Sequence, residues 1–434
     1  MDAEVRELVR EAVKVAGGLA GIVEDGQVVV IKPNVVMTRA VGGGIKLLMT
    51  IFDDPFRESQ QVPELVNGIT TDRRVTRAVV ELVRELNPSG KVYVMECAGD
   101  GLTSENFRRM GYTHENIPGV DDFVAIGEDG EHRNTEAGDL VAVEVENRQY
   151  KKLPRFLKDK YYFDKTYYSA DVIISLGCVK NHMCAAVSGG IKNVGIGARP
   201  ACIYAPRGRT GSTLVIGHGW KPLNAFIHDY YSARPADFVL SDGLQGLSYG
   251  PAAHGAPGYD QARMNLRIIL ASKDPVACDA VQACIVGVDP ERVPCLRDLA
   301  DEGFGTIDTS RITVLGNARV DEVKKPFPLA RGLIGRLLSR GPRKAVYGDF
   351  SAPELQVEAV SFKDGELSAS LKVDPKTTKI ELQIDGRLAA TVVEGFEDLR
   401  YRPPGGIPGG THAVTILAYD RFFNCGHRSV EVVV

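Results

Sequence analysis

The chain of 434 residues is 44% hydrophobic and 25% charged, a balance typical of globular proteins. Its formal net charge of −4 argues against nucleic-acid binding, which normally requires a basic excess. No apolar run approaches the roughly 18 residues of a membrane span, and the acidic, helical start differs from an export signal. We therefore expect a soluble, cytoplasmic protein of about three domains with no transmembrane segment.

Helix and strand patterns alternate in the N-terminal part of the chain. Apolar residues occupy one helical face over 3–16, and residues 28–31 read as a fully buried strand. Thr71 is expected to cap the next helix, which ends before Asn87, and residues 92–95 form a second strand. This order predicts a doubly wound, mainly parallel sheet.

A long segment, residues 35–70, separates the first strand from the second helix and contains three consecutive glycines at 42–44. Structureless loops of this length are uncommon and are often functional, so we expect a lid or substrate loop. Asp274 is expected to cap a helix over 275–286. Further strands are predicted at 172–176, 238–240, 266–270 and 312–315, and this α/β core is long enough to form two lobes.

The C-terminal part of the chain differs from the core. Arginines recur along a short apolar helix within 325–351, and we interpret this segment as a linker. A basic amphipathic helix can also contact an acidic membrane surface or partner. Alternating β-branched residues follow, and the last 80 residues or so resemble bacterial immunoglobulin-like modules. We expect an α/β core at 1–324, a basic linker helix at 325–351 and an immunoglobulin-like β-sandwich at 352–434.

Residues 175–197 hold the densest group of chemically active side chains, directly after a predicted buried strand. Ligands of open α/β sheets bind at the carboxyl ends of strands. Glycine amides and lysines suit an anion, and histidine suits proton transfer near neutral pH. We predict the catalytic residues Lys180, His182, Lys192, His218 and His228, and the substrate-binding residues Lys32, Asn34, Ser188, Gly189, Gly190, Asn193 and Asp242.

Several segments together resemble the family known as domain of unknown function 362. They are VVVIKPN at 28–34, DVIISLGCVKNHM and SGGIKNVGIG within 171–197, DFVLSDGLQGLSYGP at 237–251, and IILASKDPVACDAVQACIVGVDP at 268–290. The resemblance covers about residues 25–320 and implies an α/β fold with a site around Lys180, His182 and Lys192. Some relatives carry ferredoxin-type cysteine motifs, which this chain lacks.

A weaker resemblance concerns the nickel-pincer lactate racemases, which also have a Ser-Gly-Gly-x-Lys segment followed by a histidine. It implies that Lys192 holds a cofactor and that His218 or His228 is a metal ligand. The spacing of ten between these histidines is too wide for a metal pair on one helical face.

Three functions remain open at this stage. The first is an enzyme of isomerase or lyase type that binds a small carboxylate or phosphate and uses Lys/His acid–base chemistry, without a cofactor or with a bound metal such as a nickel-type group. The second is a metal or iron–sulfur redox protein, although the cysteines form no C-x-x-C pair and otherwise read as buried thiols. It would use Cys178, Cys184 and Cys202, or Cys278, Cys284 and Cys295. The third is a non-catalytic protein whose β module and basic linker recruit a partner, either another protein or, through the β module, a second copy of the chain.

Overall fold

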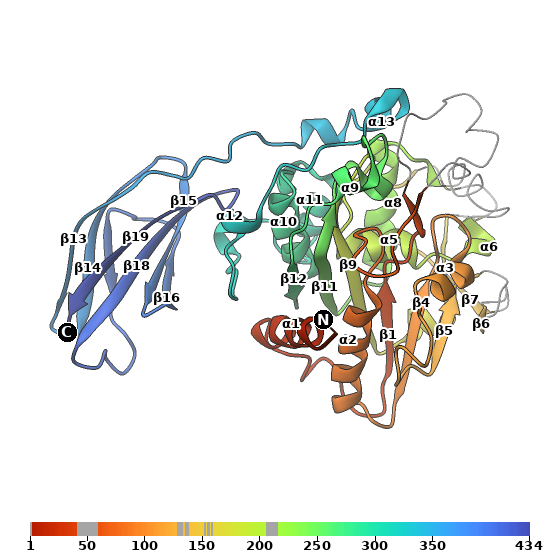
Figure 1. Cartoon of the computed structure of the whole chain (residues 1–434), viewed down its shortest axis with the longest axis horizontal. Helices are drawn as coiled ribbons and strands as arrows, with labels where there is room; N and C mark the ends of the chain where they lie inside the picture. Colours follow the sequence, from red (N-terminus) through yellow and green to blue (C-terminus); the bar gives the residue numbers. More distant parts are fainter. Residues whose placement is uncertain are drawn as a thin grey trace. The chain divides into compact units, whose positions relative to one another are not determined.

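The computed structural model describes residues 2–40, 60–127, 133–134, 139–151, 153, 157, 159–204 and 216–434 (Figure 1). The chain divides into two compact units. The first unit comprises residues 1–307 and 325–346, and the second comprises residues 308–324 and 347–434. None of the helices within the described residues has the length and hydropathy needed to cross a membrane.

The first unit is built on an eight-stranded, mainly parallel sheet with the order β12-β11-β9-β1-β4-β5-β6, in which β10 pairs with β9. The central strands are parallel, whereas β12 runs antiparallel to β11. This arrangement confirms the predicted α/β fold. The strands are β1 Val28–Pro33, β4 Lys91–Glu96, β5 Asp122–Ala125, β6 Arg133–Asn134, β9 Val172–His182, β10 Ala186–Val187, β11 Phe238–Leu247 and β12 Ile268–Ser272.

Helices cover both faces of this sheet. Valines of α1 and α2 share one hydrophobic core with Val29 and Ile31 of β1. Because side chains alternate along a strand, Val30 and Lys32 face the opposite side, where α5 packs. The helices are α1 Asp2–Val15, α2 Arg73–Leu86, α3 Thr103–Arg109, α4 Lys165–Ser169, α5 Gly190–Gly197, α6 Ala201–Tyr204, α8 Trp220–Ala233, α9 Tyr259–Ala262, α10 Pro275–Ile285, α11 Pro294–Asp301 and α13 Gly332–Leu338, with a π-helical turn, η3, at Tyr249–Ala253.

The predicted cap of the second helix is wrong by one residue. Asp72 caps α2 by accepting a hydrogen bond from the amide of Arg74 at 3.0 Å. Thr71 instead connects two strands, because its hydroxyl accepts from the amide of Asn34 at 2.9 Å and donates to the carbonyl of Leu176 at 2.8 Å. Threonine and aspartate both suit the cap position of a helix. Here the Thr71 hydroxyl is engaged by the two strands, so Asp72 serves as the cap.

Most predicted strands are present, but residues 312–315 do not form one. This segment belongs to the second unit, where the Ile312 carbonyl accepts a hydrogen bond from the Lys379 ammonium at 2.9 Å. Among the residues that the structure describes, no strand pairs with this segment. The predicted loop over 35–70 lies largely outside the described residues; its described ends form the short strands β2 Arg39–Ala40 and β3 Gln60–Gln61.

The second unit is a sandwich of two antiparallel sheets, with orders β13-β14-β17 and β16-β15-β18-β19. Leu367 and Leu371 of one sheet share a buried core with Ile380, Leu382 and Ile416 of the other. The predicted all-β module is therefore present, and its immunoglobulin-like identity stays a prediction. The strands are β13 Leu355–Lys363, β14 Glu366–Val373, β15 Thr377–Ile384, β16 Arg387–Val392, β17 Asp398–Tyr401, β18 Thr411–Asp420 and β19 Cys425–Val433.

The three segment boundaries expected from the sequence stay predictions, but the two units are not contiguous in the chain. Residues 308–324, which include the short helix α12 Val320–Val323, pack with the β-sandwich. The ammonium of Lys324 donates to the carbonyl of Phe422 at 3.2 Å, and the hydroxyl of Thr309 donates to that of Arg421 at 3.0 Å. Residues 325–346 return to the first unit.

The cap of α10 provides a test of the fold. Asp274 accepts hydrogen bonds from the amides of Ala277 at 2.9 Å and Thr306 at 3.0 Å, as the sequence predicts for the first of these. We expect Asp274→Ala to lower the free energy of unfolding by about 1–2 kcal/mol, measured by urea denaturation. Asp260→Ala, which changes an exposed aspartate, is the matched control and should change it by less than about 0.5 kcal/mol. Equal losses would contradict the capping role.

Candidate functional site

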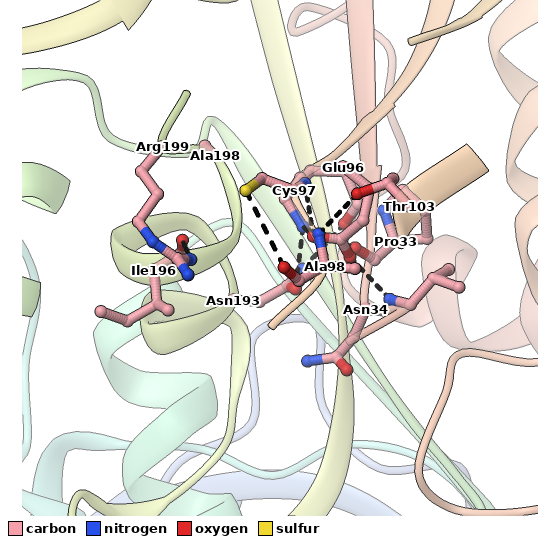
Figure 2. A network of polar contacts seen from close by, with 12 residues as sticks. Pro33, Asn34, Glu96, Cys97, Ala98, Thr103, Asn193, Ile196, Ala198 and Arg199 are labelled. Atoms are coloured by element: carbon pink, nitrogen blue, oxygen red, sulfur yellow. Dashed lines mark hydrogen bonds and ion pairs between the residues drawn. The ribbon is translucent and has the colours of Figure 1, made fainter. Parts of the chain in front are cut away.

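A fully buried ion pair joins the carboxyl ends of β1 and β4 (Figure 2). The Lys32 ammonium donates to Glu96 Oε1 at 2.8 Å, to the carbonyl of Pro33 at 2.7 Å and to Asn193 Oδ1 at 3.3 Å. Glu96 also accepts from the backbone amides of Val35 and Cys97, at 2.6 and 2.8 Å. Burial lowers the pKa of Lys32, and Glu96 opposes this shift. All three ammonium hydrogens have acceptors within the protein, and the substrate contact expected of Lys32 stays a prediction.

Asn193 ties α5 to this ion pair. Its Nδ2 donates to the carbonyl of Lys32 at 2.8 Å and to the hydroxyl of Ser175 at 3.1 Å. At the end of the same helix, a Cβ on Gly197 would lie 2.5 Å from Lys32 Nζ, so a larger residue would displace the ammonium. These contacts hold α5 against β1, and the substrate contact expected of Asn193 stays a prediction.

The first amides of α5 are also occupied. Asp279 of α10 accepts hydrogen bonds from the amides of Gly190 at 2.8 Å and Ile191 at 3.0 Å. A Cβ on Gly189 would lie 2.1 Å from Asp279 Oδ1, which explains the glycine there. Burial raises the pKa of Asp279 to about 7, against the effect of both amides. Asp279 therefore occupies the amides of Gly190 and Ile191, and the anion contacts expected at Gly189 and Gly190 stay a prediction.

Lys180 and Asn34 lie together at the carboxyl ends of β9 and β1. The Lys180 ammonium donates to Asn34 Oδ1 at 3.2 Å and to the carbonyl of Ile69 at 2.5 Å. Burial lowers the pKa of Lys180, which is completely enclosed. The amide of Ser188 donates to the carbonyl of Lys180 at 3.0 Å. Figure 2 shows the Asn34 carboxamide directed away from the Glu96 network. One ammonium hydrogen of Lys180 remains without an acceptor among the described residues.

Lys192 of α5 differs from the other two lysines. Its ammonium has no hydrogen-bond or ion-pair partner in the described part of the chain, and its side chain is only partly exposed. Burial, together with the positive charges of Lys180 and Arg199, lowers the pKa of Lys192 to about 7. The amine is therefore about half deprotonated at neutral pH, which an ordinary lysine with a pKa near 10.4 is not.

His182 is held in one tautomer. Its Nδ1 accepts hydrogen bonds from the backbone amides of Cys184 at 3.0 Å and Ala185 at 3.1 Å. Because Nδ1 is an acceptor, the neutral ring carries its proton on Nε2. Burial and the charge of Lys192 place the pKa of His182 well below its usual range. His182 is accordingly a neutral hydrogen-bond donor at physiological pH.

His218 is buried at Nδ1, where the described residues offer no hydrogen-bond partner. Burial and the charges of Arg199 and Lys192 lower the pKa of His218 to about 4. His218, Lys192 and Lys180 also depress the pKa of His182, which brings four of the predicted residues into one group. We call Lys180, His182, Lys192 and His218 the lysine–histidine cluster.

Two predicted residues lie in separate networks. His228 of α8 contacts Asp229 at 2.8 Å, and Asp229 in turn accepts from the hydroxyl of Tyr161. Although burial disfavours its charge, Asp229 and Glu302 raise the pKa of His228. Asp242 accepts from the amides of Asp72 and Leu244, so both oxygens hold the protein backbone. Burial raises the pKa of Asp242 to about 7.

Strained backbone adjoins the cluster. Ala186, Tyr249 and Ala253 have φ angles of 69°, 55° and 61°, a region that side chains other than glycine rarely adopt. The η3 turn is held against the end of β9, because the amide of Gly250 donates to Asn181 Oδ1 at 2.8 Å. Such outliers are concentrated at functional sites, which supports a functional reading of this region.

The described cysteines do not form a metal site. No three His, Cys, Asp or Glu side chains within the described residues lie together as ligands. Cys202 is exposed, whereas Cys178 and Cys184 are buried and burial raises the pKa of each to about 12. Burial also raises the pKa of Cys278 and Cys295, so these thiols resist forming the thiolates that clusters require.

Sequence reasoning missed the partners of the predicted residues. Glu96 accepts from Lys32, and Asp279 accepts from the first amides of α5. Arg199 contributes to the lowered pKa of His218, and His254 contributes to that of His182. Glu96 directly follows a predicted strand, as Lys32 does. This shared position is a signal that could have identified Glu96 as the partner of Lys32. Nothing in the local pattern marks Arg199 or His254.

The first unit is therefore an α/β protein with a lysine- and histidine-rich site at the carboxyl edge of a mainly parallel sheet. Residues 59–284, just over half of the chain, match the family described as a domain of unknown function (DUF362). The chain belongs to this family. No curated protein matches the chain.

Several solved structures are similar to parts of the chain. The lactate racemase apoprotein of Thermoanaerobacterium thermosaccharolyticum is 15% identical with a TM-score of 0.36, and the match covers 64% of this chain and 55% of that one. The fibronectin(III)-like modules of CbhA from Clostridium thermocellum are 17% identical with a TM-score of 0.16, covering 19% of this chain and 95% of that one. The spore cortex lytic enzyme SleM of Clostridium perfringens is 10% identical with a TM-score of 0.17, and the match covers 19% of this chain and 28% of that one.

The buried pair of Lys32 and Glu96 can be tested with a double-mutant cycle. We expect Lys32→Met to lower the free energy of unfolding by about 3–5 kcal/mol, because it leaves the Glu96 charge buried without a partner. Adding Glu96→Gln should recover part of this loss, since the second change removes the uncompensated charge. Additive losses in urea denaturation would show that the two groups are not coupled.

Proposed function

We propose that the first unit is an enzyme of isomerase or lyase type that binds a small carboxylate or phosphate and transfers a proton with lysine and histidine. The observation that carries this proposal is Lys192, a partly buried amine with a pKa of about 7 and without a partner among the residues that the structure describes. Amines and acids whose pKa lies near the working pH are the most efficient proton-transfer groups. Strongly shifted pKa values that cluster in one place favour a functional site.

Substrate binding follows from the charge balance of the site. Lys180 keeps one ammonium hydrogen without an acceptor among the described residues, and Arg199 and Lys192 add positive charge. Glu96, a carboxylate that acts on both Lys180 and Lys192, is neutralised by Lys32. An anion would relieve the mutual repulsion of these cations, and it would also raise the pKa of Lys192.

The protonation states of Lys192, His182 and His218 suggest which of them moves a proton. The neutral fraction of Lys192 would remove a proton from the carbon next to the substrate carboxylate. His182 would donate its Nε2 hydrogen to the oxygen on which negative charge develops, since its tautomer is fixed by Cys184 and Ala185. The ammonium that this step forms on Lys192 would return the proton to the product, and His218, which is neutral, would accept a hydrogen bond from the substrate.

A nickel-type cofactor, which the sequence resemblance to lactate racemases implies, fits part of this arrangement. The Lys192 amine has no partner and is nucleophilic near pH 7, and the Nδ1 of neutral His218 has no donor beside it in the described part of the chain. These two residues would hold such a group, which would supply Lewis-acid or redox chemistry when bound. His182 does not fit as a ligand through Nε2, because that nitrogen carries its proton.

The other two functions have less support. An iron–sulfur redox role would need cysteines that lie together, and near-stoichiometric iron in anaerobically purified protein would favour it. A non-catalytic role would make the lysine–histidine cluster dispensable, so that only removal of residues 352–434 would abolish partner binding. Elemental analysis, the titration of Lys192 and the substitution of Lys192 distinguish the three functions.

The titration of Lys192 can be measured without a known substrate. We expect competitive acetylation, read by mass spectrometry across pH 5–11, to give Lys192 a midpoint near 7, whereas ordinary lysines titrate near 10.4. Exposed Lys14 is the internal reference. A Lys192 midpoint near 10 would contradict the proposed base. Inorganic phosphate or a small carboxylate should raise the midpoint, because a bound anion stabilises the charged amine.

Substitution of Lys192 tests catalysis once a turned-over carboxylate has been found by screening. We expect kcat/KM of the wild type to rise about tenfold per pH unit below pH 7 and to level off above it, because the deprotonated amine is the active form. Lys192→Ala should lower kcat by about 10²–10⁴-fold. Lys192→Arg keeps the charge without a base, and retained activity in this variant would assign Lys192 to binding alone.

A further inference from the structure

One segment of the first unit combines positive charge with exposed apolar side chains. We call residues 331–346, which include α13, the basic segment. It holds five cationic residues and no acidic one, although the chain as a whole has a net charge of −4. The neighbouring acidic residues along the chain are Glu322 and Asp349. The five cationic residues, all exposed, are Arg331, Arg336, Arg340, Arg343 and Lys344.

The apolar side chains of the basic segment are unusually exposed. Leu333 and Leu337, one turn apart on α13, are 71% and 54% exposed, and Val346 is 43% exposed. Leu102 is the other large apolar side chain of the first unit that is exposed among the described residues. A single exposed leucine is ordinary, whereas several in one cationic segment indicate an interaction surface.

The basic segment is anchored to the α/β unit through its backbone. The amide of Arg331 donates to the carbonyl of His254 at 3.1 Å, and the amide of Asp289 donates to that of Ala345 at 2.7 Å. A Cβ on Gly341 would lie 2.1 Å from the ring of Trp220, which shows how closely the segment packs there. With the backbone fixed, the arginines line a hollow of about 540 Å³ and the leucines stay at the surface.

We propose that the basic segment binds the surface of a membrane that contains anionic lipids. The arginines would contact lipid phosphates, and Leu333 and Leu337 would enter the boundary between headgroups and acyl chains. Guanidinium groups bind phosphate with paired hydrogen bonds, which matches four arginines around one hollow. The seven-residue α13 is too short to cross a bilayer, so it would lie on the membrane surface. Figure 1 shows α13 at the top edge of the first unit.

Vesicle cosedimentation of the full chain tests this proposal. We expect binding to phosphatidylcholine vesicles that contain 40% phosphatidylglycerol, and at least tenfold weaker partitioning onto pure phosphatidylcholine. Arg336→Glu together with Arg340→Glu should weaken partitioning by at least about tenfold, since each cation near an anionic surface contributes about fivefold. Leu333→Ser together with Leu337→Ser should also weaken it, and should reduce the part of the binding that survives 0.5 M salt.

The control is Arg400→Glu together with Arg402→Glu, which makes the same change in net charge at exposed arginines of the β-sandwich. This control should bind as the wild type does, and unchanged Lys192 acetylation should show that the α/β unit of each variant is folded. Equal binding to both kinds of vesicle, or binding unaffected by the substitutions in the basic segment, would overturn the proposal. A dimer that dissociates when Leu333 and Leu337 are replaced would also overturn it, because a second copy would then cover the surface.

Discussion

The α/β unit depends on one buried ion pair, that of Lys32 and Glu96. Removing two charges from water costs several kcal/mol each unless close contacts compensate. Here the contacts are complete: the ammonium has three acceptors, and the carboxylate also accepts two backbone amides. The pair therefore determines how β1, β4 and α5 meet, because Asn193 and Gly197 of the helix fit around the same ammonium.

This pair also affects the electrostatics of the neighbouring site, where burial is the largest cause of the lowered pKa values. Because Glu96 is matched by Lys32, no carboxylate of this network is left to pair with Lys180 or Lys192. Both lysines keep unbalanced charge in a partly enclosed region, and the pKa of each falls. The histidines respond in the same direction, and His182 and His218 are neutral where an exposed histidine would be partly charged. A structural ion pair thus favours a reactive amine near it.

The sequence predicts local features well and distant partners poorly. Apolar runs correctly located the central strands, and the short separation of Lys180, His182 and Lys192 placed them together. Local pattern could not choose between Thr71 and Asp72 as a cap, because strand contacts make that choice. It also could not show that Lys32 and the Gly190 amide already have carboxylate partners, which lie 64 and 89 residues away. Distinguishing residues that bind a ligand from residues that pair within the protein requires these long-range contacts, which local sequence does not contain.

Helix α5 is held at both ends, by Asp279 at its first amides and by the Lys32 network near its last turn. A helix of eight residues fixed in this way has little conformational entropy left to lose when a ligand arrives. The ordering that a mobile loop would undergo during binding has already taken place during folding. The backbone that carries Lys192 is therefore preorganised, and molecules will be discriminated by how well they fit a fixed helix rather than by how well that helix adapts to them.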